Sequence, residues 1–164
     1  MASRFLIRCP EDKRGRHVDA SAEGVPCEPF TMVVEVGKIR EFARSVNSAN
    51  PAYLEGWAPV SPPTFLATAS YWMGPQSSPM LQADLNLERV LNGAQEFVFH
   101  GPPPRAGARL TGTGRIDRVY QKTGRRGGVM TFLEVVYEYA DEAGDPVAEV
   151  RSTVIETANA VAGE

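Results

Sequence analysis

The spacing of apolar residues along the chain changes from helical to strand-like near residue 94. Between residues 36 and 46 the apolar positions recur at helical spacing, and the charged positions fall between them. This pattern predicts an amphipathic helix with one face toward a core. From residue 94 onward apolar and polar residues alternate, which predicts strands with one buried face.

Turn-forming residues divide the alternating half into separate strands, and a short β-rich segment precedes the helix. Gly-Pro and Gly-rich segments mark the breaks, because these residues favour turns over continued pairing. We expect strands over residues 30–35, 95–100, 108–121, 129–140 and 147–157.

Two further helices are expected between the first helix and the long strands. Residues 47–51 (NSANP) end the first helix, since the residue before a proline disfavours the α region. Ser61-Pro62-Pro63 supplies a helix start, and the mostly apolar segment Thr64–Met73 predicts a helix buried on most sides. A third short helix is predicted over Asp84–Asn92, which ends before Gly93.

The hairpin between the two longest strands is expected to turn about Gly124-Arg125. Arg115 would then face Glu134, and Ile116 would face Leu133, so that opposite charges and apolar side chains pair.

The same register places Gly112 and Gly114 on the buried face, with Gly112 opposite Tyr137. Glycine weakens a strand interior unless another group approaches the backbone closely. We therefore expect a helix, or a bound chain, to cross the sheet at these two glycines.

The order of elements predicts one hot-dog fold of the α+β class, in which a long curved antiparallel sheet wraps around a central helix. We expect residues 30–157 to form this domain. Residues 1–29 form an N-terminal arm and residues 158–164 a flexible tail in this interpretation. Glycines and prolines interrupt any helical or strand period in the arm, and charges cluster in it, so we expect it to lack regular secondary structure.

Composition narrows the possible partners. The chain has 164 residues, 43% of them hydrophobic and 23% charged, which is ordinary for one soluble domain. A net charge of −3 argues against nucleic acid as a partner, and no apolar run is long enough to cross a membrane.

Cys9 and Cys27 lack metal or redox spacing, so we interpret them as reduced thiols in the cytoplasm, with a disulfide between them as the alternative. No metal or cofactor motif is present.

Three segments together resemble a known family: residues 37–56 (GKIREFARSVNSANPAYLEG), 61–72 (SPPTFLATASYW) and 84–124. They are similar to the N-terminal type of MaoC-like dehydratase domain, a type that includes the non-catalytic subunits of bacterial (3R)-hydroxyacyl-thioester dehydratases. The resemblance covers residues 30–157. It implies a hot-dog dimer or double hot dog that acts on acyl thioesters of coenzyme A or acyl carrier protein, and an acyl chain as one candidate neighbour of the two buried glycines.

The resemblance also shows what this chain lacks. Active members carry the motif G-D-x-N-P-L-H, whose Asp and His handle water and proton. Asn50-Pro51 matches the Asn-Pro of that motif, but the Asp position falls on Ser48 and the His position on Tyr53. Neither serine nor tyrosine is an effective base near neutral pH.

A third departure concerns the thioester carbonyl. Active members polarise it with a backbone N–H at the start of the second helix, where this chain has Pro63, which has no N–H. Losing one such donor typically costs ~10²–10³ in rate. No residue is therefore assigned a catalytic role. The resemblance leaves a set of substrate-binding candidates: Asn50, Pro51, Tyr53, Pro63, Thr64 and Phe65.

The leading functional prediction is an acyl-thioester-binding subunit that forms a homodimer, or a heterodimer with a catalytic MaoC-like subunit. A self-sufficient hydratase or an acyl-CoA thioesterase using Glu55 is the alternative, and a binding module with a closed pocket is a third. The identity of the acyl chain stays open. So does the role of Arg125 and Arg126, which could meet coenzyme A phosphates or an acidic carrier protein.

Overall fold

The computed structural model describes residues 23–83, 85–124 and 128–158. Five antiparallel strands form one sheet in the order β1-β3-β4-β5-β2. The strands are β1 (Phe30–Val33), β2 (Val90–Phe99), β3 (Arg109–Thr123), β4 (Val129–Ala140) and β5 (Pro146–Glu156). The helices are α1 (Val36–Ser45), α2 (Pro51–Leu54), α3 (Pro79–Gln82) and the 3₁₀ helices η2 (Phe65–Tyr71), η3 (Pro75–Ser77) and η4 (Leu87–Arg89).

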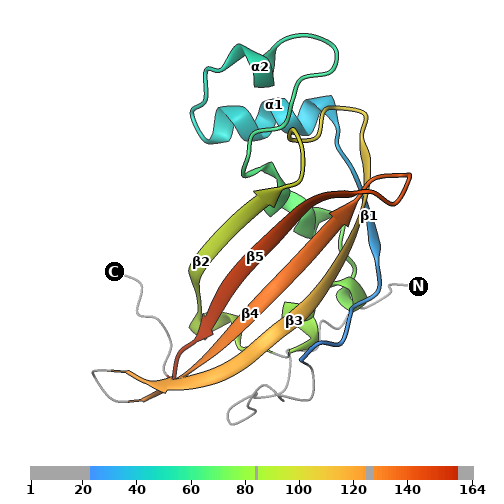
Figure 1. Ribbon diagram of the computed structural model, residues 1–164. Helices are drawn as coiled ribbons and strands as arrows, with labels where there is room; N and C mark the ends of the chain where they lie inside the picture. Colours follow the sequence, from blue (N-terminus) through green and yellow to red (C-terminus); the bar gives the residue numbers. More distant parts are fainter. Residues whose placement is uncertain (1–22, 84, 125–127, 159–164) are drawn as a thin grey trace, which may run out of the picture.

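The helices occupy two places around the sheet (Figure 1). α1 and α2 stand together beyond one end of the long strands, while the segment that contains η2 and α3 lies against one face. This is the α+β arrangement that the sequence predicts, with a curved sheet around a central helical segment.

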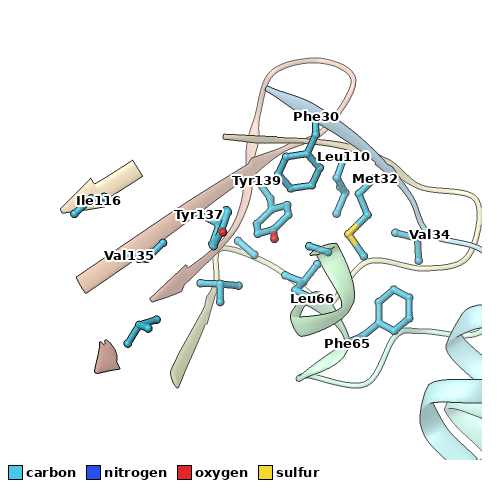
Figure 2. Close-up of a cluster of buried hydrophobic side chains, with 14 of the residues drawn as sticks. Phe30, Met32, Val34, Phe65, Leu66, Leu110, Ile116, Val135, Tyr137 and Tyr139 are labelled. Carbon is cyan, nitrogen blue, oxygen red and sulfur yellow. The ribbon is translucent and has the colours of Figure 1, made fainter. Parts of the chain in front are cut away.

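The core lies between that helical segment and the inner face of the sheet. Alternate residues of the three central strands point into it, as the period of two predicts. Figure 2 shows Phe30 and Tyr139 beside Leu66 of η2, with Met32 and Leu110 close by. The Phe30 and Tyr139 rings pack edge to face at 6.1 Å between centroids. The sheet thus holds η2 by apolar and aromatic contact.

The predicted helix over Thr64–Met73 is shorter and tighter than expected, because η2 is a 3₁₀ helix. Its backbone bonds run three residues apart, as from Ala67 N to the Thr64 carbonyl at 3.0 Å. The Thr68 hydroxyl donates to the Phe65 carbonyl at 2.8 Å. In an α-helix that carbonyl would accept from Ala69, so the threonine side chain competes with the α-helical pattern.

The third predicted helix, Asp84–Asn92, is wrong. η4 covers only three residues, and β2 begins at Val90 instead of residue 95. β2 pairs with β5 from Val90–Glu156 to Phe99–Ala148, with one irregularity at Gly93. Pairing along a neighbouring strand overrides the local helical pattern.

The predicted β3–β4 register is also wrong. Arg115 lies opposite Val136 and Ile116 opposite Val135, two positions from the expected partners. The connection is longer than the expected turn, because Gly124 N donates to the Gly128 carbonyl at 3.0 Å and Gly128 adopts φ +86°. A bulge between residues 116 and 118 adds a further shift. A shift of two keeps each side chain on its predicted face.

The expectation of a helix crossing the sheet at the two glycines holds for Gly114, which Pro79 of α3 approaches. At Gly112, which lies opposite Tyr139 and not Tyr137, the close neighbour is instead Phe30 of the paired strand β1. A Cβ on Gly112 would lie 2.4 Å from the Phe30 ring, and one on Gly114 would lie 2.9 Å from Pro79 of α3. Protein side chains therefore fill this space.

The end of the arm lies along β3 beyond β1. Gly24 N donates to the Ile116 carbonyl and Cys27 N to the Gly114 carbonyl, both at 2.8 Å. Cys27 is a buried free thiol. Cys9 and the rest of the arm lie outside the described residues.

We predict that Gly114→Ala destabilises the protein by about 1–3 kcal/mol, because an added methyl group would overlap Pro79 and the Tyr137 ring. Urea unfolding measures the effect. Gly101→Ala is the matched control, since a Cβ there meets nothing within 4 Å. Equal stability of the two variants would contradict the close packing described here.

A second prediction concerns Tyr137. Burial raises the pKa of its phenol to about 12, although a hydrogen bond with Ser78 opposes the shift. The fold therefore favours the neutral phenol. Its contribution to the free energy of unfolding is complete below the pKa of the unfolded chain, near 10, and is lost as pH rises from about 10 through 12.

Wild type should therefore lose on the order of 2–3 kcal/mol over that interval relative to Tyr137→Phe, from a shift of about two pKa units. Urea unfolding at pH values on either side of 10 measures the difference. Tyr71→Phe, at a side chain that is 81% exposed, should show no such relative change. Parallel behaviour of wild type and Tyr137→Phe across this range would refute the assignment.

Candidate functional site

The Asn-Pro turn is a helix cap. The Asn50 side chain accepts a hydrogen bond from Ala52 N at 3.0 Å, and Pro51 occupies the first turn of α2, where its missing N–H costs nothing. The Ser48 hydroxyl accepts from Asn50 N at 3.4 Å. Both polar side chains of the turn are therefore engaged with its own backbone.

Arg40 of α1 fixes the position of α2. Its Nε donates to the Leu54 carbonyl at 3.0 Å and its Nη2 to the Gly56 carbonyl at 2.7 Å. These bonds satisfy carbonyl groups at the end of a one-turn helix. The amphipathic α1 buries Ile39 and Ala43 on its apolar stripe. The unit of α1 and α2 therefore follows from the predicted apolar stripe together with one arginine off that stripe.

The remaining family positions lie around the start of η2 and beside the core. Tyr53 is half-buried and packs against the hydrophobic core. Pro63 and Thr64 are exposed, and Phe65 N donates to the Pro62 carbonyl at 2.9 Å. The amide of Phe65 is thus occupied, in addition to the missing N–H of Pro63.

A groove of about 530 Å³ runs between α1 and η2. Phe42 and Phe65 contact each other edge to face within it, at 5.7 Å between centroids. Lys38 Nζ lies 4.8 Å from the centroid of the Trp72 ring and forms an ion pair with Glu35. The lining residues are Lys38, Glu41, Phe42, Ser45, Phe65, Thr68, Tyr71 and Trp72.

Of the six predicted substrate-binding residues, only Phe65 lines this groove. Tyr71 and Trp72 lie in the segment Thr64–Met73 that was predicted to be buried on most sides, although Tyr71 is 81% exposed. Phe42 belongs to the helical stripe, and nothing in the sequence distinguishes it from a core residue. The assignments of Asn50, Pro51, Tyr53, Pro63 and Thr64 stay predictions.

The groove offers little for acid–base chemistry. No histidine lines it, and its carboxylate, Glu41, is exposed. Ser48 is not among its lining residues. Within residues 23–83, 85–124 and 128–158, no group of three His, Cys, Asp or Glu side chains is arranged to hold a metal ion. Nor does this part of the chain contain a helix long and apolar enough to cross a membrane.

The basic residues of β3 divide into two groups. Arg115 forms ion pairs with Glu138 at 2.7 Å and Asp117 at 3.5 Å, as expected of a structural role. Arg118 and Lys122 instead lie over the Tyr120 ring, at 4.9 and 5.0 Å from its centroid. Arg125 and Arg126 lie outside the described residues.

Comparisons with known proteins agree with this architecture. The family model for the FAS1-like dehydratase domain region matches residues 21–150. The UPF0336 protein SCO4636 of Streptomyces coelicolor is 36% identical over 129 residues, which cover 73% of this chain and 82% of that protein. A UPF0336 protein of Streptomyces avermitilis is also 36% identical, over 74% of this chain and 81% of its own length.

Two solved complexes from Mycobacterium tuberculosis share the fold. The C-terminally truncated HadBC (3R-hydroxyacyl-ACP dehydratase) complex matches with a TM-score of 0.61 and 24% identity, over 82% of this chain and 96% of that one. The ChsH1–ChsH2 complex matches with a TM-score of 0.62 and 18% identity, over 87% and 89%. The predicted hot-dog fold is thereby confirmed. This chain belongs to the family of the FAS1-like dehydratase domain region.

Proposed function

We propose that this protein is a subunit of a MaoC-like (3R)-hydroxyacyl dehydratase or enoyl hydratase that binds the acyl thioester and leaves the chemistry to a partner. One observation carries the proposal: an aromatic groove lies between α1 and η2, while the positions that the family resemblance assigns to the catalytic Asp and His hold Ser48 and Tyr53, neither of which lines the groove. The chain thus offers a groove for an acyl chain without the base and acid of the motif.

The groove suits an acyl chain. Its volume falls within the range of small-molecule pockets, roughly 300–1,000 Å³. Phe42, Phe65 and Trp72 give it an apolar lining, against which an acyl chain can be buried at about 25 cal/mol per Å². A carrier attached through a thioester would remain at the open side, so either coenzyme A or an acyl carrier protein is compatible with it.

The chemical step needs groups that this chain does not supply at the family positions. Hydration across a double bond requires a general base and a general acid close to the reacting carbons. The Ser48 hydroxyl accepts a backbone hydrogen bond, and Tyr53 packs against the core. A partner subunit with the Asp and His of the G-D-x-N-P-L-H motif would provide both groups.

The edge strand β2 supports a partner. Among the described residues it pairs only with β5, which leaves the backbone groups on its other side available to a second chain. Leu91 and Val98 are 41% and 36% exposed along it. Two fold relatives are complexes, HadBC and ChsH1–ChsH2. We infer a dimer through this edge, with a catalytic MaoC-like subunit or with a second copy, in the cytoplasm.

The alternatives have less support. A thioesterase would need Glu55, which is exposed at the end of α2 and does not line the groove. A binding module with a closed pocket disagrees with an open groove of this size. The groove therefore favours the substrate-binding subunit over both.

The purified chain alone should hydrate a short enoyl thioester such as crotonyl-CoA no faster than buffer. Adding a hot-dog subunit that carries the G-D-x-N-P-L-H motif and co-purifies from the native host should restore turnover, because that subunit supplies base and acid. Loss of the enoyl absorbance measures the reaction. Full activity of the isolated chain would overturn the proposal.

A pair of variants tests the groove itself. Thr68→Trp, which places an indole in the groove, should lower partner-dependent kcat/KM at least about tenfold, the equivalent of roughly 1.4 kcal/mol. Ala67→Trp, at the exposed neighbour outside the groove, is the matched control and should retain activity. Equal kcat/KM for the two variants would show that the acyl chain does not bind in this groove.

A separate prediction concerns the edge. Val98→Lys should shift the protein from dimer to monomer in light scattering at micromolar concentration, because a charge on an edge strand opposes pairing. Val129→Lys, at a comparably exposed valine on β4, should leave the dimer intact. A wild-type monomer would exclude the homodimer, and a dimer that survives Val98→Lys would exclude β2 as its interface.

A further inference from the structure

The edge of β3 that faces away from β4 is covered by β1 over only part of its length. β3 runs from Arg109 to Thr123, whereas β1 pairs with residues 109–112 alone. Beyond Gly112 the backbone N–H and C=O groups of such an edge are a template for pairing with another chain. In this protein the residues that precede β1 occupy that place instead.

These residues, 23–28 (EGVPCE), are called the strap below, because they lie along β3 where β1 has ended. Cys27 N donates to the Gly114 carbonyl at 2.8 Å. Gly24 N donates to the Ile116 carbonyl, also at 2.8 Å. Two carbonyl groups of the edge are therefore already used within the chain.

A side chain of the strap covers the next position. The Glu23 carboxylate accepts a hydrogen bond from Val119 N. The bulge between Ile116 and Arg118 changes which residues of β3 point their backbone groups toward this edge. A carboxylate can accept from an N–H group without being part of a regular strand, so the cover continues past the bulge.

Gly24 gives the strap the turn that it needs. Glu23 forms a parallel bridge with Ile116, and Pro26 forms an antiparallel bridge with Arg115. The chain must therefore reverse its direction relative to β3 between these two bridges. Gly24 adopts φ +75°, a conformation that other residues rarely take.

The strap is also attached on the side of the helical segment. Glu28 N donates to the Gln76 carbonyl of η3 at 3.1 Å, and the Cys27 side chain is buried. Pro26 has no N–H to offer to a further strand, and proline on an edge opposes pairing. The strap thus covers the β3 edge without providing an equivalent edge of its own.

We propose that the strap closes the β3 edge against a second copy of this chain. In the described part of the chain, β2 is then the one long open edge of the sheet, because β1 has only four residues. A two-fold contact between β2 edges ends after two copies, whereas a sheet with two open edges can add copies at both sides. The proposal goes beyond the proposed function, and only the limit of two copies rests on the dimer proposed at β2.

The first test measures amide hydrogen exchange at Val119 in the full chain labelled with ¹⁵N. Glu23→Ala removes the acceptor of that N–H and should speed its exchange at least about tenfold. Glu28→Ala is the matched control, because this second carboxylate of the strap is equally exposed and its backbone N–H is kept. Equal exchange in wild type and Glu23→Ala would overturn the proposal.

The second test opens the strap. Gly24→Pro combined with Cys27→Pro removes both N–H groups that donate to β3. In light scattering this double variant should have a larger mass than wild type, and the mass should rise with protein concentration. Cys27→Ala keeps both N–H groups and should keep the wild-type mass. A double variant that is folded by near-UV circular dichroism and has the wild-type mass would overturn the proposal.

Val98→Lys separates this proposal from the dimer proposed at β2. Added to the double-proline variant, it should leave pairs of chains that associate through β3, whereas Val98→Lys alone should give a monomer. A monomer from the combined variant would assign the added association to β2 and overturn the role of the strap. A wild-type monomer would exclude the β2 homodimer, but the double-proline variant should still be heavier than wild type.

Discussion

The close contact between the helical segment and the inner face of the sheet is the constraint on which the structure depends. Gly112 and Gly114 let Phe30 and Pro79 approach β3 to distances that a Cβ would exclude. Leu66 and Phe65 can then be fully or almost fully buried against the sheet. Because protein side chains fill this space, an acyl chain has to lie elsewhere. We propose that it lies on the outer side of η2, in the aromatic groove beside α1.

The same contact explains the form of the candidate site. η2 is held to the sheet through Leu66 and Ala69, so its other side, with Thr68 and Tyr71, faces α1 and solvent. α2 is a single turn, stabilised by the Asn50 cap and by Arg40. The side chains of Ser48 and Asn50 accept hydrogen bonds from the backbone of the turn that leads into it. We propose that this turn keeps a structural role, while Ser48 and Tyr53 stand at the positions that the family motif gives to its Asp and His.

The local pattern of the sequence was enough to predict much of the fold. The stripe of α1, the fold class, the faces of the strands and the close neighbour at the two glycines each follow from periodicity or from one residue's requirements. The Arg115–Glu138 pair follows from charges on one face of the sheet, even though the predicted register was two residues off.

Several of the errors come from features that local pattern does not reveal. β2 begins five residues early because β5 offers a partner along its whole length. The hairpin register depends on a bulge near Asp117 and on a five-residue connection, neither of which side-chain alternation reveals. The groove residues were missed because Phe42 and Trp72 look like core residues until the separation of α1 and η2 is known.

We propose that this chain binds the acyl thioester and that its partner transforms it. The most direct measurement is single-turnover hydration by the reconstituted complex, compared between Ser48→Ala in this chain and Asp→Asn in the partner's motif. The account predicts a change within about twofold for Ser48→Ala and a loss of about 10²–10⁴ for the partner variant. A large loss from Ser48→Ala, with activity retained in the partner variant, would contradict it.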